Sequence, residues 1–331
     1  MPQGAGGARR RGGVLVAEVT PRSPYRLPTQ RWPDGVARTR GGVYERFLRV
    51  QGCPILIRAW ELRREGRVAI AAMPAPPAWL EEEPANHAGP EQLERAIALA
   101  RNALGVDDDL SDFHARFRRD RMLGPLIRRR PWIRARRAGK PWEALAWAIT
   151  EQLIEAGRAA TIQRRIVARW GSHLRMPAGA RRLRDVPGPA LIAGLAPAEL
   201  TALDLAPKRA VALVKVAREV ASGRCDLNSV EGDRRLLSIS EIGPWTIQCL
   251  GLNGRGDLDS LPAGDLAYLK LVGRLSGEGR RATIDEVHEF YARFEPYRGI
   301  AGLLTLSGLG RPVNEGPPLR YHPPVPEYEA A

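Results

Sequence analysis

The sequence contains few cysteines. Its 331 residues include only Cys53, Cys225 and Cys249, which are widely separated and odd in number. This excludes a disulfide framework, a zinc finger and a four-cysteine iron–sulfur cluster, and it favours a reducing, cytoplasmic setting. The five histidines also lack the spacing of metal ligands, so we expect no metal site formed by side chains.

Long hydrophobic runs are also absent. No window approaches the roughly eighteen apolar residues that a membrane span requires, so no membrane partner is expected. The apolar run over residues 14–19 is short and contains Glu18, so it does not resemble an export signal. An apolar content of 44% is typical of a packed globular protein. At about 150 residues per domain, the length predicts two or three domains.

Acidic residues are outnumbered by basic ones. The 51 Lys and Arg residues exceed the 37 Asp and Glu residues by 14, which favours a polyanionic partner such as nucleic acid. Residues 116–140 contain eleven basic residues and one acid, and residues 158–184 contain eight and none. Because acids are so scarce within these two basic windows, we interpret the windows as a phosphate-facing surface. A set of solvated helix faces is the alternative.

Short apolar runs separated by glycine-containing breaks predict a small β domain. The predicted strands cover residues 14–19, 43–50, 55–62 and 68–73. A proline-rich linker is expected over residues 74–89, and from residue 88 onward an apolar period of about 3.6 residues predicts only helices. The four expected segments are a disordered tail (1–13), a small α/β N-terminal domain (14–86), a helical core (87–311) and a proline-rich tail (312–331).

Two local patterns carry chemistry. The tight turn at Ile242 and Gly243, with Pro244 at the first position of the next helix, predicts two helices joined by a short hairpin. The amides at such a helix start can bind a phosphate, although an ordinary helical hairpin has the same pattern. Twenty residues after Trp245, the sequence Leu-Pro-Ala-Gly ends in Asp265, at the start of a further predicted helix. A carboxylate there is also a plausible helix N-cap.

Together these segments resemble the helix-hairpin-helix DNA glycosylases, in particular the bacterial 3-methyladenine DNA glycosylase II branch. Four pieces match in order and spacing over about residues 88–311: residues 149–154, 242–246, 261–266 and 294–299. The resemblance implies an α+β protein, with a small N-terminal β-containing domain followed by an all-α glycosylase core of two helical subdomains. It also implies a monomer that binds double-stranded DNA.

The resemblance assigns the catalytic role to Asp265. A carboxylate beneath the sugar would stabilise the oxocarbenium-like transition state of glycosidic bond cleavage. Trp245 occupies the place where lyase members of the superfamily carry a nucleophilic lysine, so we predict a monofunctional, hydrolytic N-glycosylase that leaves an abasic site, as in base excision repair. A strand-cutting lyase, with Lys270 as the nearby amine, and a non-catalytic DNA-binding protein are the alternatives.

Further residues receive roles from the same resemblance. Leu153 matches the residue that intercalates into DNA when the base flips out, although simple core packing is the alternative. The substrate pocket is expected to include Gln152, Trp245, Cys249 and Leu306. The other expected DNA contacts are Ile242, Gly243, Thr246 and Arg298. No cofactor is expected except a monovalent cation, Na⁺ or K⁺, held by the backbone carbonyls of Ile239 and Ile242.

The sequence departs from the family pattern at three of these places. Glu241 stands where the hairpin normally has glycine, so a side chain is forced into a turn that needs positive φ, and its charge would repel a phosphate. Cys249 and Leu306 replace two aromatic residues of the pocket. An alkylated base is the first expectation, but the extra room would also suit a bulkier or uncharged base, such as a hypermodified cytosine of phage DNA. That substrate would imply anti-phage defence.

Overall fold

The computed structural model describes residues 9–11, 13–29, 32–81, 86–175, 182–277 and 279–309. Its N-terminal part is an antiparallel sheet with the strand order β1-β2-β6-β5-β4-β3. The strands are β1 (Arg9–Arg11), β2 (Val14–Val19), β3 (Ala37–Arg40), β4 (Val43–Val50), β5 (Cys53–Leu62) and β6 (Arg67–Pro74). Burial alternates along β2, as expected for a sheet with one covered face.

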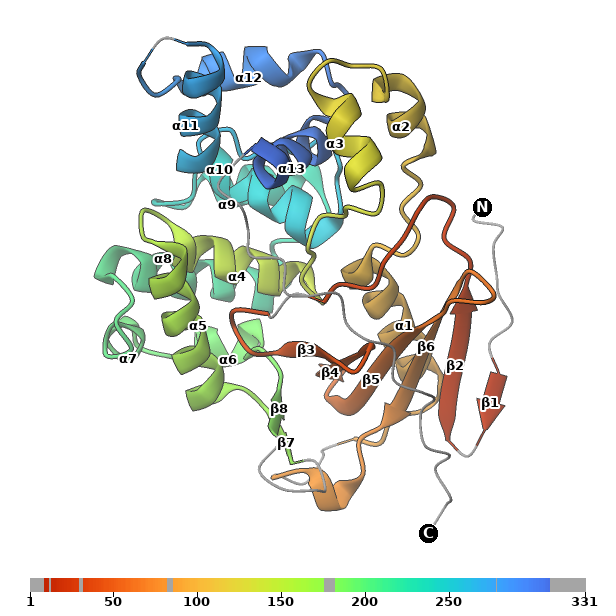
Figure 1. The fold of residues 1–331 in the computed structure, drawn as a ribbon. Helices are drawn as coiled ribbons and strands as arrows, with labels where there is room; N and C mark the ends of the chain where they lie inside the picture. Colours follow the sequence, from red (N-terminus) through yellow and green to blue (C-terminus); the bar gives the residue numbers. More distant parts are fainter. Residues whose placement is uncertain are drawn as a thin grey trace.

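Helix α1 (Pro90–Leu104) covers one face of this sheet (Figure 1). Its apolar residues Leu93, Ile97 and Ala100 share a core with Ile57 and Ile70 of the central strands. The packing therefore groups α1 with the sheet, past the expected domain limit at residue 86. The opposite face, at Phe47 and Leu56, packs against the short hairpin of β7 (His173–Arg175) and β8 (Arg182–Arg184).

The remaining helices form two lobes, each with its own core. The first core joins α4 (Pro141–Glu151), α5 (Ala156–Trp170), α6 (Pro189–Ala193), α7 (Pro197–Thr201), α8 (Pro207–Ala221), α9 (Val230–Leu237) and α10 (Pro244–Leu250). The second joins α2 (Ser111–Phe117), α3 (Leu123–Arg129), α11 (Leu266–Leu275), α12 (Ile284–Ala292) and α13 (Arg298–Leu309). Figure 1 shows the two lobes one above the other, with α10 near their junction. The predicted α+β class and the two helical subdomains are confirmed.

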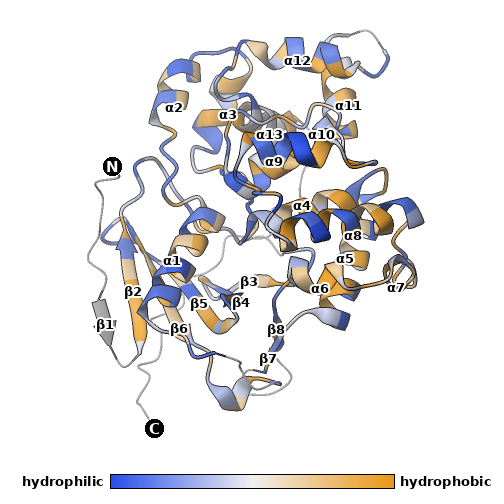
Figure 2. Ribbon diagram, turned by 180° about the vertical axis from the view of Figure 1, so that it is seen from behind, coloured by the Kyte–Doolittle hydropathy of each residue, from blue (hydrophilic) through white to orange (hydrophobic). Residues whose placement is uncertain are grey.

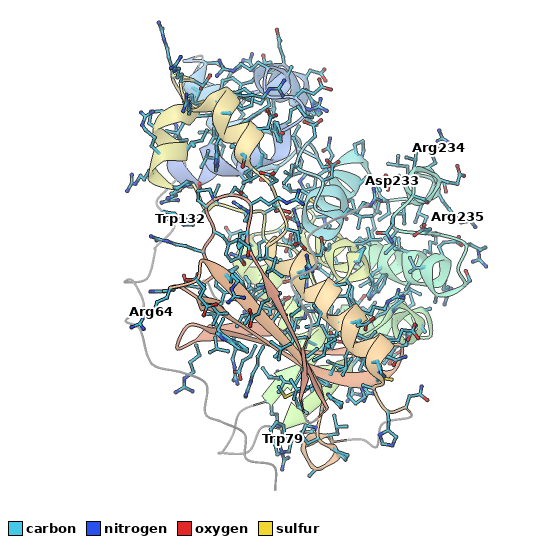
Figure 3. The ribbon with its side chains drawn as sticks, turned by 90° about the vertical axis from the view of Figure 1, so that its right-hand side faces the viewer. Arg64, Trp79, Trp132, Asp233, Arg234 and Arg235 are labelled. Carbon is cyan, nitrogen blue, oxygen red and sulfur yellow. The ribbon has the colours of Figure 1, made fainter. Side chains whose placement is uncertain are left out.

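The hydropathy of the elements matches these positions. Figure 2 shows β2 mainly hydrophobic and the exposed helix α9 mainly hydrophilic. The charged residues of α9, Asp233, Arg234 and Arg235, lie close to one another at one side of the helical part (Figure 3). Asp233 forms a bidentate ion pair with Arg255, which follows α10 in a π-helical turn over Gly251–Arg255.

Several local predictions were wrong. Arg9–Arg11, expected in a disordered tail, pairs with β2. Strand β3 was not predicted, and the hairpin of β7 and β8 interrupts a region expected to be all-helical. Within the expected linker, Pro77–Trp79 forms a 3-10 turn and Leu80 forms a β-bridge with Leu174. These segments have three or four residues each, too few for a hydrophobic period to emerge. The expected tail over residues 312–331 lies outside the described residues.

A buried ion-pair cluster fixes α4 to the sheet. Arg46 of β4 is 2% exposed, and its Nη2 lies 2.5 Å from Glu143 Oε2 on α4. Asp185, before α6, lies near the same guanidinium and accepts a hydrogen bond from Lys140 Nζ at 2.8 Å. On the next turn of α4, Trp147 Nε1 donates to Asp34 Oδ2 at 2.9 Å. The sheet domain thereby sets the position of α4, whose C-terminal end reaches the candidate site.

Candidate active site

The hairpin between α9 and α10 turns at Ile239–Gly243. The amide of Ile242 donates to the carbonyl of Ile239 at 3.0 Å, which closes the turn. Glu241 has φ +73°, so the expectation that this position needs positive φ is confirmed. The turn is therefore strained by a residue with a side chain. Lys208 Nζ lies 3.9 Å from Glu241 Oε1 and partly offsets the negative charge at the hairpin.

Gln152, the C-cap residue directly after α4, is bound to this hairpin. Its Nε2 donates to the carbonyl oxygen of Glu241 at 2.8 Å and to Thr246 Oγ1 at 3.0 Å. The side chain of Gln152, expected in the substrate pocket, is thus bound to the hairpin. Thr246 is 1% exposed, so its side chain fixes α10 to α4 rather than facing solvent.

Leu153 projects away from the protein. Its side chain is 93% exposed, and its φ of +55° lies in the left-handed region that non-glycine residues rarely adopt. This excludes core packing, the alternative explanation of this residue. Because the preceding residue, Gln152, is hydrogen-bonded to the hairpin, Leu153 is held outward at a defined place. An exposed apolar residue in strained backbone points to a functional contact.

Asp265 is the N-cap of α11 and is half-buried. Its Oδ1 accepts a hydrogen bond from the amide of Ala267 at 2.8 Å. Within the described chain, Oδ2 has no hydrogen-bond partner. The two interpretations of Asp265 are therefore compatible, because capping occupies one oxygen and orients the carboxylate while the other oxygen stays free for a ligand.

Trp245 and Cys249 line the same region from α10. A Cβ placed on Gly264, the residue before Asp265, would lie 3.8 Å from Trp245 Cβ, so the indole lies against the Asp265 loop. Its buried Nε1 lacks a hydrogen-bond partner among the described residues, a rare condition that points to a partner absent from the free protein. Burial raises the pKa of the Cys249 thiol, and the nearby carboxylates of Glu151 and Asp265 raise it further, so the thiol stays neutral.

The two remaining predicted residues lie in the second lobe. Leu306 is half-buried on α13 and packs against that lobe's core. Arg298, at the start of α13, forms a bidentate ion pair with Asp259, to which its backbone amide also donates at 2.9 Å. The structure thus gives the guanidinium of Arg298 an intramolecular partner, and its contact with DNA stays a prediction.

Glu151 is a site residue that the sequence reasoning missed. It is the last residue of α4, and Gln163 Nε2 of α5 donates to its Oε1 at 3.0 Å. Its side chain reaches solvent, yet protein surrounds it on most sides. That burial raises the pKa of Glu151, and the negative charges of Asp265 and Asp34 raise it further, while Gln163 and Arg136 oppose the shift. One signal in the sequence could have pointed to Glu151. It is an acidic residue at the C-terminal end of a predicted helix, where the helix dipole disfavours negative charge.

The basic windows are partly neutralised by acids from outside them. Asp108 pairs with Arg137, Asp185 pairs with Lys140, and Asp204 pairs with Arg158. The interpretation of the windows as one phosphate-facing surface therefore overstated the charge available to DNA. Further basic residues of the windows that contact acids are Arg116, Arg134, Arg165, Arg175 and Arg182.

Comparison with known proteins shows which sequences this chain resembles. No protein-family model matches the sequence. A probable bifunctional transcriptional activator and DNA repair enzyme AlkA of Mycobacterium tuberculosis is 28% identical over 229 residues, which cover 68% of this chain and 45% of that protein. A DNA-3-methyladenine glycosylase of Bacillus subtilis is 23% identical over 202 residues, 59% of this chain and 66% of that protein. The chain thus matches about half the length of the mycobacterial relative.

Solved structures share the fold over nearly the whole chain. A 3-methyladenine DNA-glycosylase from Archaeoglobus fulgidus superposes with a TM-score of 0.71 at 19% identity, covering 89% of this chain and 99% of that one. The chain is similar in sequence and in fold to helix-hairpin-helix DNA glycosylases. Within the superfamily it resembles the AlkA-like branch. A Clostridium acetobutylicum 8-oxoguanine glycosylase/lyase bound to double-stranded DNA has a TM-score of 0.64 at 13% identity, over 92% of this chain and 98% of that one.

The described part of the chain contains neither a membrane-spanning helix nor a side-chain cluster suited to a metal. None of its described helices is long and apolar enough to cross a membrane. No group of three or more His, Cys, Asp or Glu side chains in the described ranges is arranged to hold a metal ion. At the hairpin, the carbonyl of Ile239 already accepts one hydrogen bond, from Ile242. Each carbonyl oxygen has a second lone pair, so a cation at Ile239 and Ile242 stays a proposal.

Proposed function

We propose that this protein is a monofunctional DNA N-glycosylase that flips a damaged or modified base out of double-stranded DNA and hydrolyses its glycosidic bond. The observation that carries the proposal is the outward projection of Leu153 at 93% exposure, on a helix end that is fixed to the hairpin. An extruded base leaves a gap in the stack, and an apolar wedge fills it. A protein that only grips the phosphate backbone has no need of such a wedge.

Asp265 supports catalysis as well as binding. The amide of Ala267 holds one carboxylate oxygen, and the other has no hydrogen-bond partner among the described residues. In this position the carboxylate would stabilise the positive charge that develops on the sugar and would orient the attacking water. Replacing Asp265 by Asn should lower the excision rate about a hundredfold or more, the loss typical of one preorganised group.

The absence of lyase activity is proposed from the residues around Asp265. Trp245 lies against the Asp265 loop and has no amine, so it cannot form a Schiff base with the sugar. Lys270 is exposed on α11, one helical turn beyond Asp265, and is not part of the hairpin. The reaction should therefore end at an abasic site with an intact strand.

The names of the relatives support an alkylated base as the first substrate to test. A second candidate is a bulkier modified base, because the pocket positions Cys249 and Leu306 carry a thiol and an aliphatic side chain instead of aromatic rings. Aromatic rings favour cationic bases through cation–π attraction, and their absence removes that preference. If the substrate is a modified base of phage DNA, the proposed role of the protein in the cytoplasm is defence against phage rather than DNA repair. We propose that the protein acts as a monomer.

The test is an excision assay on duplexes that carry alkylated, deaminated or phage-type modified bases, with alkali added after the reaction. Strand breaks that appear only after alkali, and that disappear with Asp265→Asn, would establish monofunctional excision and identify the base. Breaks without alkali would show a lyase instead. DNA binding without excision of any base would favour the non-catalytic alternative.

A further inference from the structure

The segment that leads to Asp265 lies along the first turn of α13. Residues 256–264, all within the described chain, connect the π-helical turn after α10 to Asp265 and form neither helix nor strand. A segment without a regular hydrogen-bond ladder has to satisfy its backbone groups on its neighbours, so contacts with those neighbours determine where it lies. The start of α13 provides several of these contacts, although it follows Asp265 in the chain.

Arg298, the first residue of α13, holds this segment at Asp259. Its Nε donates to both carboxylate oxygens of Asp259 at 3.0 Å, and its Nη2 also donates to Oδ2. The backbone amide of Arg298 donates to Oδ1 at 2.9 Å, so one residue binds the carboxylate through main chain and side chain. With 33% and 20% of their side chains exposed, Arg298 and Asp259 are only partly screened by solvent. A planar guanidinium bound at two points fixes the orientation of the carboxylate as well as its distance.

Two further contacts lie on the same turn of α13. The amide of Ile300 donates to the carbonyl of Leu258 at 3.0 Å. A Cβ on Gly299 would lie 2.9 Å from that carbonyl oxygen, and closer still to the carbonyl oxygen of Ser260, so the close approach requires glycine. The first turn of α13 therefore contacts three successive residues, Leu258, Asp259 and Ser260.

The rest of the segment links these contacts rigidly to Asp265. Leu261 and Ala263 are buried in the core of the second lobe. The amide of Ala263 donates to the carbonyl of Leu261 at 2.7 Å. The amide of Asp265 donates to the carbonyl of Pro262 at 2.9 Å, and the amide of Ala267 holds Oδ1 of Asp265. The position of the Asp265 carboxylate therefore depends on where α13 holds the preceding residues.

We propose that Arg298 is a positioning residue for excision: through Asp259 it sets the place of the Asp265 carboxylate, instead of making the DNA contact that the sequence predicts. The inference rests on the proposed glycosylase function and on the role of Asp265 in it. A preorganised carboxylate stabilises the transition state from a defined place, and a displacement of about 1 Å can cost about a hundredfold in rate.

The experiment measures the excision rate and DNA binding separately, with the full chain. The rate is the single-turnover rate at saturating protein on a duplex carrying 7-methylguanine, or the base that the wider panel identifies. Binding is measured on a duplex carrying an abasic-site analogue at several salt concentrations. Asp259→Asn and Arg298→Ala should each lower the rate by about ten- to a hundredfold. Neither should change the affinity by more than about twofold, or the slope of log affinity against log salt.

Three further variants test the cause of the loss. The double variant should be no slower than the slower single variant, because each change breaks the same pair. Arg298→Lys keeps the charge that a phosphate contact needs but loses the two-point fit to Asp259, so it should also be slow. Asp107→Asn is the matched control, because Asp107 accepts two hydrogen bonds from Arg101, at 2.8 and 2.6 Å, beside the end of α1. Its rate should be unchanged, and melting temperatures verify that every variant is folded at the assay temperature.

Several results would overturn the inference while the glycosylase function stands. Weaker binding by Arg298→Ala with a salt slope lower by about 1, together with tighter binding by Asp259→Asn, would show a phosphate contact instead. Unchanged rates would show that the pair does not position Asp265, as would additive losses in the double variant. An equal loss in the Asp107 control would show a general effect of removing an ion pair. If the unchanged protein excises no base of the panel, the proposed function itself fails, and the inference fails with it.

Discussion

At the scale of single residues, the site combines side chains whose backbone conformations are unfavourable for them. Leu153 and Glu241 both have positive φ, and both lie at the contact between α4 and the hairpin. Such strain costs on the order of 1–3 kcal/mol at each position and persists only where the surrounding structure imposes it. Gln152 provides that restraint. Its side-chain amide is hydrogen-bonded to the hairpin that contains Glu241, and Leu153 is the next residue in the chain, so the same residue holds both strained positions.

Leu153→Ala should therefore separate function from stability. The side chain is 93% exposed, so its removal should change the free energy of unfolding by less than about 0.5 kcal/mol. Loss of the wedge should slow excision from duplex DNA by about tenfold or more, because unstacking costs a few kcal/mol. Excision from single-stranded DNA should change little. A large fall in melting temperature, or equal losses on both DNA forms, would contradict this role.

Glu241→Gly should improve the hairpin in two ways. Glycine adopts positive φ without strain, so the melting temperature should rise by an amount corresponding to about 1 kcal/mol. Removing the charge should also strengthen DNA binding at low salt. Gln51→Gly is the matched control, because Gln51 has φ +50° in the turn between β4 and β5, away from the site. The control should leave DNA affinity unchanged; a gain in affinity from it would show that glycine acts through general stabilisation.

At the scale of elements, the sheet domain supports the site through α4. Arg46, Glu143 and Asp185 form the buried cluster at one end of this helix, and Glu151, Gln152 and Leu153 follow its other end. Arg46 belongs to a central strand and is 2% exposed, so water cannot take the place of the carboxylates as partners of its guanidinium. The position of Leu153 thus depends on contacts made at the far end of α4.

Glu143→Ala should be strongly destabilising. It leaves the guanidinium of Arg46 buried without its main carboxylate, and removal of one partner of a buried pair typically costs about 3–5 kcal/mol. Thermal or urea denaturation measures the loss. The matched control is Arg63→Ala, which removes an exposed partner of Glu61 and should cost less than about 1 kcal/mol. Similar effects of the two variants would mean that the buried cluster does not hold the domains together.

The sequence predicted the elements whose signals are local and long enough. The four apolar runs became β2, β4, β5 and β6, and the turn before Pro244 became the hairpin, because strand burial and helix starts leave direct patterns. The short hairpin of β7 and β8 left none, since each strand buries a single leucine between basic residues. Glu151 was missed because its environment depends on Asp265 and Asp34, each more than a hundred residues away in the chain.

At the scale of the whole molecule, the net charge of +14 is not a single DNA-facing surface. The fold brings acids from outside the basic windows to many of their arginines. Arg134, for example, is only 5% exposed in its side chain and donates to Ser23 Oγ at 2.7 Å. By contrast, the side chain of Lys208 is 83% exposed beside the hairpin, although it lies in neither window. Position in the fold therefore determines which cations can reach a phosphate.

The dependence of DNA affinity on salt distinguishes these two kinds of basic residue. Each phosphate contact that is lost lowers the slope of log affinity against log salt by about 1. Lys208→Ala should show this decrease with an unchanged melting temperature, because its side chain is exposed and its pairing with Glu241 is weak. Arg134→Ala should leave the slope unchanged and lower the melting temperature, because it removes a buried group that joins Ser23 and Asp108. The reverse pattern would mean that the window over residues 116–140 faces DNA after all, and that the hairpin side does not.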